Sequence, residues 1–117
     1  MEDRIGKWLY DIKRSIEEIE SFMPDTETGR YLLQENIMFK RALERNVEII
    51  GEAVNRILST EPEIAITHAR RIVDTRNFII HEYEKVSDEV LWAIAIRHIP
   101  LLKIEIEALL EHRSPEP

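Results

Sequence analysis

Apolar residues recur at intervals of three and four along almost the whole chain, and this spacing limits its fold more than any other feature. Over the first helical stretch the pattern consists of Ile5, Trp8, Leu9, Ile12, Ile16, Ile19 and Met23. Such spacing places the apolar side chains on one face of an α-helix. No segment alternates between apolar and polar residues as a half-buried strand does. The sequence therefore predicts an all-α fold, a bundle of four to five helices.

Breaks in the spacing predict where the first helices begin and end. Pro24 ends a first helix that spans residues 3–23. Residues 25–35 contain Gly29 and have no clear period, so we expect a loop there with one helical turn. A long helix follows over residues 36–58.

Two residues in this middle part of the chain indicate how its helices are arranged. Gly51, in the middle of the long helix, indicates a close crossing with another helix. Pro62 suits the first turn of the next helix, which carries residues 70–85 and ends near residues 83–86.

The last helix is apolar almost all round between Val90 and Leu102. It is therefore expected either in the centre of the bundle or at a subunit interface. Ser87 and Asp88 can cap its start, and Pro100 should kink it. We expect a single domain over residues 1–111 and a frayed tail over 112–117.

Composition narrows the class of protein. The chain has 117 residues, no cysteine and a net charge of −7. The absence of cysteine excludes disulfides and thiolate chemistry and favours a cytoplasmic location. The net charge disfavours a protein that coats nucleic acid without specificity, although a local cleft of Arg70, Arg71, Arg76 and Arg97 could still be positive. Neither a signal peptide nor a membrane span is expected.

One charged residue interrupts an apolar stripe. On a helix, Ala65, Ala69, Ile72, Arg76, Ile79 and Tyr83 fall in one line, flanked by Val73 and Ile80. A guanidinium stays charged at ordinary pH, and leaving it unpaired among aliphatic side chains costs several kcal/mol. A carboxylate, a phosphate or a water-filled cleft should therefore meet Arg76.

Three more polar residues lie close to Arg76 in the sequence. Arg76 can hold a phosphate with a planar fork of donors, and His81 can transfer protons near neutral pH. Asn77 can hydrogen-bond the imidazole or a phosphate, and Tyr83 can donate to a phosphate or stack on a base. These are the groups needed for metal-independent RNA cleavage. However, Arg76 and His81 lie about 140° apart on an ideal helix, so they do not converge through spacing alone.

Two other groups of polar residues have competing interpretations. Glu17, Glu18 and Glu20 could suggest a metal site, but carboxylates on one helix face are usually only solvated, and we expect no metal. Glu52 and Asn55 either face the cleft or belong to the ordinary surface, and the surface interpretation is favoured.

The segment from Arg76 to Tyr83 reads RNFIIHEY and resembles the R-N-x-x-x-H-x-Y signature of the HepT-like toxins, a branch of the HEPN superfamily of ribonucleases. Average residue usage would give this match by chance in roughly one chain of this length in ten thousand. Residues 44–53 and 99–102 resemble further conserved parts of that family.

The resemblance implies an all-helical homodimer of HEPN type. It implies an endoribonuclease that needs no metal or cofactor and uses Arg76 and His81, with Asn77, Tyr83, Arg70 and Arg71 supporting RNA binding. It further implies the toxin of a type II toxin–antitoxin system, whose MNT-type nucleotidyltransferase antitoxin transfers AMP to Tyr83. The alternative is a non-catalytic HEPN module that binds a nucleotide or a partner protein.

Overall fold

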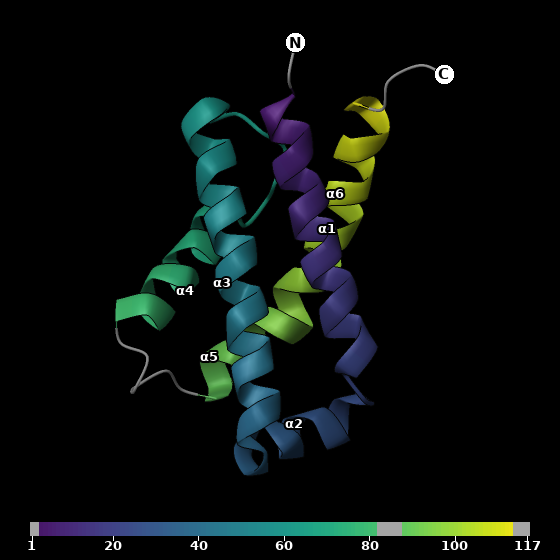
Figure 1. The fold of residues 1–117 in the computed structure, drawn as a ribbon, viewed down its shortest axis with the longest axis vertical. Coiled ribbons are helices and arrows are strands. Elements are labelled where there is room, and N and C mark those ends of the chain that lie inside the picture. Colours follow the sequence, from purple (N-terminus) through teal and green to yellow (C-terminus); the bar gives the residue numbers. More distant parts are fainter. Residues whose placement is uncertain (1–2, 82–87, 114–117) are drawn as a thin grey trace.

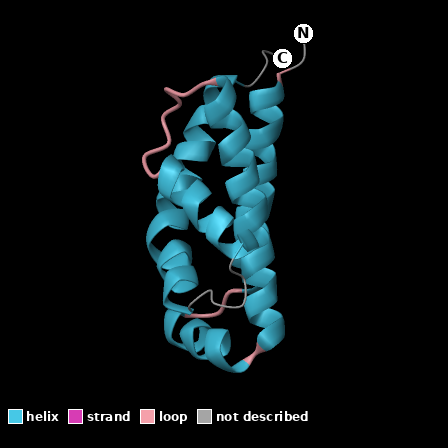
Figure 2. Cartoon of the chain, turned by 90° about the vertical axis from the view of Figure 1, so that its left-hand side faces the viewer, coloured by secondary structure: helices cyan, strands magenta, loops and turns pink. Residues whose placement is uncertain are grey.

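The computed structural model describes residues 3–81 and 88–113, and every regular element in these ranges is a helix (Figures 1 and 2). In chain order the elements are α1 (Arg4–Phe22), α2 (Thr26–Glu35), α3 (Ile37–Thr60), α4 (Ala69–His81), α5 (Asp88–Ala93), the π-helix η2 (Ile94–His98) and α6 (Ile99–Arg113). Because α5, η2 and α6 follow without a break, they form one long helix. The predicted all-α fold of four to five helices is confirmed.

Helix α3 lies at the centre of the bundle. Helix α1 packs along one side of it and α4 crosses its other side, while α6 lies beside α1 (Figure 1). Their apolar faces form one core, whose fully buried members include Leu9, Ile12, Ile16, Leu43, Val47, Val54, Ile57, Ile79, Leu91, Leu102 and Ile106. In the described ranges, no helix is long and apolar enough to cross a membrane.

Side-chain caps fix the starts of the first three helices. The carboxylates of Asp3 and Asp25 accept from the backbone N–H groups of Gly6 and Thr28, both at 3.0 Å. The amide oxygen of Asn36 accepts from the N–H of Phe39 at 3.1 Å. Each cap satisfies a donor that has no partner within its helix, so the helix begins at the next residue.

The expectation of a loop over residues 25–35 is wrong, because α2 occupies Thr26–Glu35. Gly29, which appeared to weaken a helix, is buried where α2 approaches α5. A Cβ on Gly29 would lie 2.9 Å from the Trp92 ring and 3.0 Å from the Met23 sulfur. Glycine therefore permits close packing here, and burial of Leu33 holds the helix in place.

The predicted early start of the following helix is also wrong. Residues 61–68 form no helix, and α4 begins at Ala69, so Pro62 does not occupy its first turn. Ile64 and Ile66 are buried from this loop. Glu105 on α6 accepts from the backbone N–H and the hydroxyl of Thr67, at 3.1 and 2.5 Å. These contacts hold the loop, which contains tight turns, against the bundle.

Pro100 distorts the last helix as expected, and the distortion is a π-helical turn. The N–H of Ile99 donates to the carbonyl of Ile94, five residues back, immediately before the proline that lacks a donor. The helix changes direction between α5 and α6 (Figure 1). It then continues to Arg113, two residues into the expected tail, where Arg113 pairs with Asp3 at 3.4 Å.

Candidate functional site

Arg76 lies where α4 crosses α3, directly over Gly51. A Cβ on Gly51 would overlap the Cβ of Arg76 and would lie 2.8 Å from its Cγ and 3.3 Å from the carbonyl oxygen of Ile72. The predicted close crossing at Gly51 is confirmed. The aliphatic stem of Arg76 therefore packs as an apolar residue would, while its guanidinium extends past α3.

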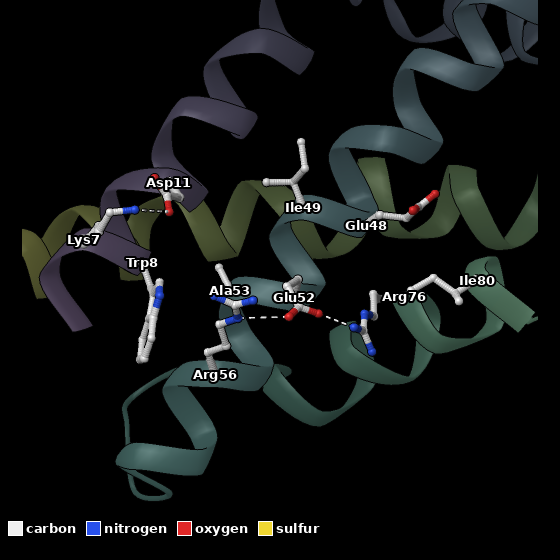
Figure 3. Close-up of a pocket in the computed structure, with 10 residues that line it drawn as sticks. All are labelled: Lys7, Trp8, Asp11, Glu48, Ile49, Glu52, Ala53, Arg56, Arg76 and Ile80. Atoms are coloured by element: carbon white, nitrogen blue, oxygen red, sulfur yellow. Dashed lines mark hydrogen bonds and ion pairs between the residues drawn. The ribbon is translucent and has the colours of Figure 1, made fainter. Parts of the chain in front are cut away.

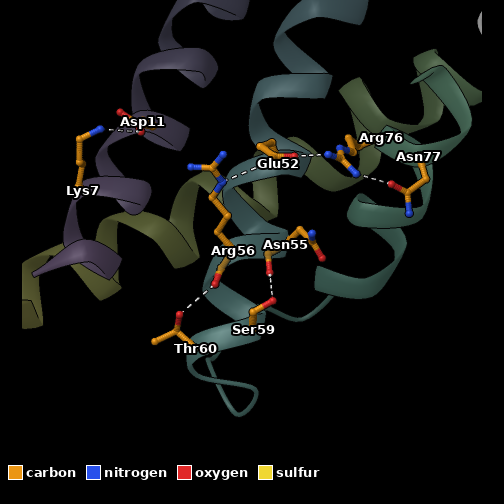
Figure 4. A network of polar contacts seen from close by, with 9 residues as sticks. All are labelled: Lys7, Asp11, Glu52, Asn55, Arg56, Ser59, Thr60, Arg76 and Asn77. Atoms are coloured by element: carbon orange, nitrogen blue, oxygen red, sulfur yellow. Dashed lines mark hydrogen bonds and ion pairs between the residues drawn. The ribbon is translucent and has the colours of Figure 1, made fainter. Parts of the chain in front are cut away.

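The guanidinium is bound on two sides (Figure 4). It donates to the Glu52 carboxylate and to the side-chain oxygen of Asn77. The other oxygen of Glu52 accepts from Arg56 Nε at 2.9 Å. The hydrogen bond from Arg56, followed by the charge of Arg76, keeps the pKa of Glu52 below its usual value. Of the three partners expected for Arg76, which were a carboxylate, a phosphate or a water-filled cleft, the structure shows a carboxylate, and the surface interpretation of Glu52 is wrong.

Arg76 and Glu52 line an open cleft of about 400 Å³ between α1, α3 and α4, here called the Arg76 cleft (Figure 3). Its lining consists of Lys7, Trp8, Asp11, Glu48, Ile49, Glu52, Ala53, Arg56, Arg76 and Ile80. The three basic residues are matched by three acidic ones, so the cleft is not the positive one that was expected. Arg70, Arg71 and Arg97 do not line it, and neither does Asn55.

His81, the last residue of α4, is exposed and does not line the Arg76 cleft. It shares a helix stripe with Asn77 and the exposed Arg70, on a different side of α4 from Arg76. A single chain thus joins Arg76 to Asn77 but does not bring His81 to the guanidinium. Tyr83 lies outside the described residues.

Arg56 was not expected at the site. Its signal in the sequence was the four-residue spacing from Glu52, which puts a carboxylate and a guanidinium on the same face of a helix. Within residues 3–81 and 88–113, no three His, Asp or Glu side chains gather closely enough to hold a metal ion.

Comparison with known proteins gives this geometry a family context. A family model described as Ribonuclease HepT-like matches residues 12–109. The chain belongs to the HepT-like ribonuclease family. The matched range contains Gly51, Glu52 and the motif that begins at Arg76, so the α3 and α4 walls of the Arg76 cleft lie within it, whereas Lys7, Trp8 and Asp11 of α1 precede it.

Two relatives of this HepT-like chain carry names that describe them as ribonucleases. A Thermococcus cleftensis protein named "Probable ribonuclease HepT" is 35% identical over 106 residues, which cover 87% of this chain and 92% of the relative. A Methanocaldococcus jannaschii protein named "Putative RNase MJ1380" is 30% identical over 105 residues, or 88% of this chain and 94% of the relative. No solved structure gives a significant match.

Proposed function

We propose that the protein is a metal-independent endoribonuclease in which Arg76 binds the scissile phosphate and His81 transfers protons. The proposal is supported by the position of Arg76 in a chain of a ribonuclease family. The aliphatic stem of Arg76 packs tightly against Gly51, and its guanidinium donors reach the Arg76 cleft. A fixed guanidinium is suited to the charge that develops on phosphorus, because its donors need no rearrangement during the reaction.

The reaction is an internal transfer at phosphorus. A base takes the proton of the ribose 2′-hydroxyl, and the 2′-oxygen attacks the adjacent phosphorus. The bond to the 5′-oxygen then breaks, and an acid protonates this leaving oxygen. The products are a 2′,3′-cyclic phosphate end and a 5′-hydroxyl end. An imidazole can fill either proton role near neutral pH, which is the role proposed for His81.

The separation of Arg76 and His81 in one chain supports a homodimer with a shared site. A two-fold axis near α4 would place a second copy of both residues at the same cleft and would provide two imidazoles for two proton roles. Phe78 and Ile80 on α4 are 41% and 43% exposed and suit the contact. Ile72 and Ile79 on the same helix are buried in the core and cannot contribute to this contact.

The first test replaces each proposed catalytic residue. Arg76→Ala and His81→Ala should each lower the rate of RNA cleavage by about 10² to 10⁴, with unchanged helicity by circular dichroism. Arg45→Ala and His112→Ala change exposed residues outside the Arg76 cleft and are the matched controls. Cleavage should survive EDTA. Full activity of His81→Ala, or a requirement for added magnesium, would refute this mechanism.

The second test concerns assembly. Sedimentation at micromolar concentration should give about twice 13.9 kDa, as a closed two-fold dimer requires. A Phe78→Glu variant, which puts charge into the proposed contact, should sediment as a monomer and lose cleavage. An active monomer would exclude the shared site.

We also propose that the protein is the toxin of a type II system and that its cytoplasmic partner, an MNT-type nucleotidyltransferase, silences it with AMP on Tyr83. The resemblance of residues 76–83 to the family motif supports this role. An attached AMP would add negative charge and bulk two residues from His81 and would compete with RNA for Arg76.

This regulation can be tested with the nucleotidyltransferase encoded beside the gene. Incubation with it and ATP should add AMP masses to the Tyr83 peptide, and cleavage should fall in step. Tyr10 and Tyr31, which are 53% and 63% exposed, are internal controls that should stay unmodified. Equal silencing of a Tyr83→Phe variant would show that the partner acts through another residue or by occlusion.

One observation favours the alternative, a non-catalytic module that binds a nucleotide or a partner protein. Glu52 already neutralises Arg76, and the Arg76 cleft carries equal numbers of acidic and basic residues. In that case nucleotides would bind in a calorimeter with an affinity that depends on Arg76, while RNA would stay intact at every protein concentration. Cleavage that is lost in His81→Ala would rule this alternative out.

A further inference from the structure

Four basic side chains gather away from the Arg76 cleft, at the other end of α4. His68, one residue before α4, contacts His98 of the π-helix edge to face, with ring centroids 4.6 Å apart. Arg71 on α4 and Arg97 on η2 lie close enough for their charges to act on His98. These residues, His68, Arg71, Arg97 and His98, are here called the basic cluster.

The basic cluster has no counter-ion among the described residues. Burial, followed by the charges of His68, Arg71 and Arg97, lowers the pKa of His98, and no carboxylate contributes to this shift. Arg71 and Arg97 form no ion pair within residues 3–81 and 88–113. Glu105 accepts hydrogen bonds from the neutral Thr67, and Glu89 lines a hollow with Arg97, but neither forms an ion pair with the basic cluster within the described residues. Positive charge is thus concentrated in a chain whose net charge is −7.

One ring nitrogen in the cluster also lacks a partner. Nδ1 of His98 is buried and makes no hydrogen bond in the described structure. Buried polar atoms of native proteins are nearly always hydrogen-bonded, so this nitrogen calls for a partner such as a bound water or an ion. The π-helix that presents His98 and Arg97 is a rare element that is often found at functional sites.

We infer that the basic cluster binds a phosphate group of the RNA strand, at a position remote from the scissile bond. Two exposed guanidinium groups supply forked donors, and the ring N–H groups of the paired imidazoles can supply further ones. The inference rests on the proposed ribonuclease function for its choice of ligand. Its geometry does not depend on cleavage.

The position of the cluster suits a second contact on one strand. His68 and His81 are 13 residues apart, a rise of about 20 Å along α4. Arg70, Asp74 and Asn77 occupy the stripe of α4 that ends at His81, and Arg71 of the basic cluster lies about 100° round the helix from Arg70. An RNA strand of several nucleotides laid along α4 would meet both sites.

The first experiment uses inorganic phosphate, which is independent of RNA cleavage. At constant pH, titration into the 13C-labelled protein should shift the imidazole C–H resonances of His68 and His98 and leave those of His112 in place. In an Arg71→Gln/Arg97→Gln variant the shifts should disappear. Both arginines are exposed, so the fold should be retained, which circular dichroism checks. Resonances of His68 and His98 that do not respond to phosphate overturn the inference.

The second experiment measures binding of a 2′-O-methyl oligoribonucleotide of about ten nucleotides, which cannot be cleaved. The double variant should bind about tenfold more weakly, because two charge-assisted contacts are lost. The plot of the logarithm of the binding constant against the logarithm of the salt concentration should become less steep by about 1.4, which is about 0.7 for each of the two lost phosphate contacts. Arg45→Gln is the control. Cleavage of a dinucleotide, too short to reach the basic cluster, is measured on the wild type, so that activity at the Arg76 cleft is known independently of the cluster.

The two proposals can fail separately. A wild-type protein that leaves the dinucleotide and longer RNA intact refutes the ribonuclease, while the phosphate titration still decides on the basic cluster. Equal oligonucleotide affinities of wild type and double variant refute the RNA role of the cluster, whatever the outcome for cleavage.

Discussion

Substitution of Gly51 by alanine tests the link between the helix crossing and the position of Arg76. Helix propensity alone predicts that alanine in this interior position stabilises the protein by about 1 kcal/mol. The structure predicts that the substitution destabilises the protein instead. The new Cβ would overlap the Arg76 Cβ and approach the carbonyl oxygen of Ile72 to 3.3 Å. Neither atom can rotate away, because both are fixed to the backbone of α4, so the two helices must separate.

The expected size follows from the two opposing effects. Overpacking of a close contact lowers the unfolding free energy by about 1 to 3 kcal/mol. A clash with atoms fixed to the backbone should cost a value near the upper end of this range, because those atoms cannot move aside. After the gain in propensity is subtracted, Gly51→Ala should lose about 1 to 2 kcal/mol of unfolding free energy. Because the shift displaces the guanidinium of Arg76 from the Arg76 cleft, RNA cleavage should fall by about 10²-fold.

Urea denaturation at one fixed protein concentration measures the stability change, with the concentration fixed because a dimer's stability depends on it. Gly29→Ala is the matched control. It also adds a Cβ to a buried helix glycine, but its neighbours are the ends of the Trp92 and Met23 side chains, which can move, so it should lose less. In the Gly51→Ala/Arg76→Gly pair the clash is relieved, so the two changes should couple by at least about 0.5 kcal/mol. A Gly51→Ala variant as stable and active as wild type would refute the reasoning.

Two further predictions concern ionisable groups. Glu52→Gln removes the negative charge that pairs with Arg76 and Arg56. Because the Glu52 side chain is more than a third exposed, solvent screening limits the expected loss of unfolding free energy to about 1 kcal/mol, which urea denaturation can measure. The same change should tighten binding of the 2′-O-methyl oligonucleotide, because the Arg76 donors become free; unchanged affinity would argue that Glu52 does not compete with RNA. The lowered pKa of His98 means that the unfolded chain takes up its proton more readily, so stability should fall as the pH drops below about 6.5. His98→Gln should reduce this loss, and parallel profiles of wild type and variant over pH 5 to 7 would contradict the assignment.

Predictions of helices from apolar spacing and capping residues are correct where the residues that determine the helix all lie in one segment. The spacing of apolar residues predicted α1 and α3 almost to their ends, since Asp3, Asn36 and Pro24 act on the helix beside them. The same spacing singled out Arg76 as a charge in need of a partner. Gly51 correctly indicated a close crossing, because few other reasons place a glycine inside a long helix.

The rules failed where a distant segment decides the local structure. Gly29 appeared to break a helix, yet the ring of Trp92, more than sixty residues away, occupies the space that its missing Cβ leaves. Residues 61–68 continued a helical spacing into Ala65, but Glu105 and the buried Ile64 and Ile66 hold this part of the chain as a loop. In both places the packing energy of tertiary contacts outweighs local propensity.

By itself the sequence determined the helical class, the ribonuclease-like motif and the requirement that Arg76 be neutralised, because periodicity, motif spacing and charge are properties of one segment. Only the tertiary structure decided that Glu52 meets that requirement and that His68 and His98 come together from distant segments. Helix periodicity states which residues share a face, but not which other helix that face meets. The crossing at Gly51 and the distorted helix before Pro100 determine those pairings, and with them the candidate sites.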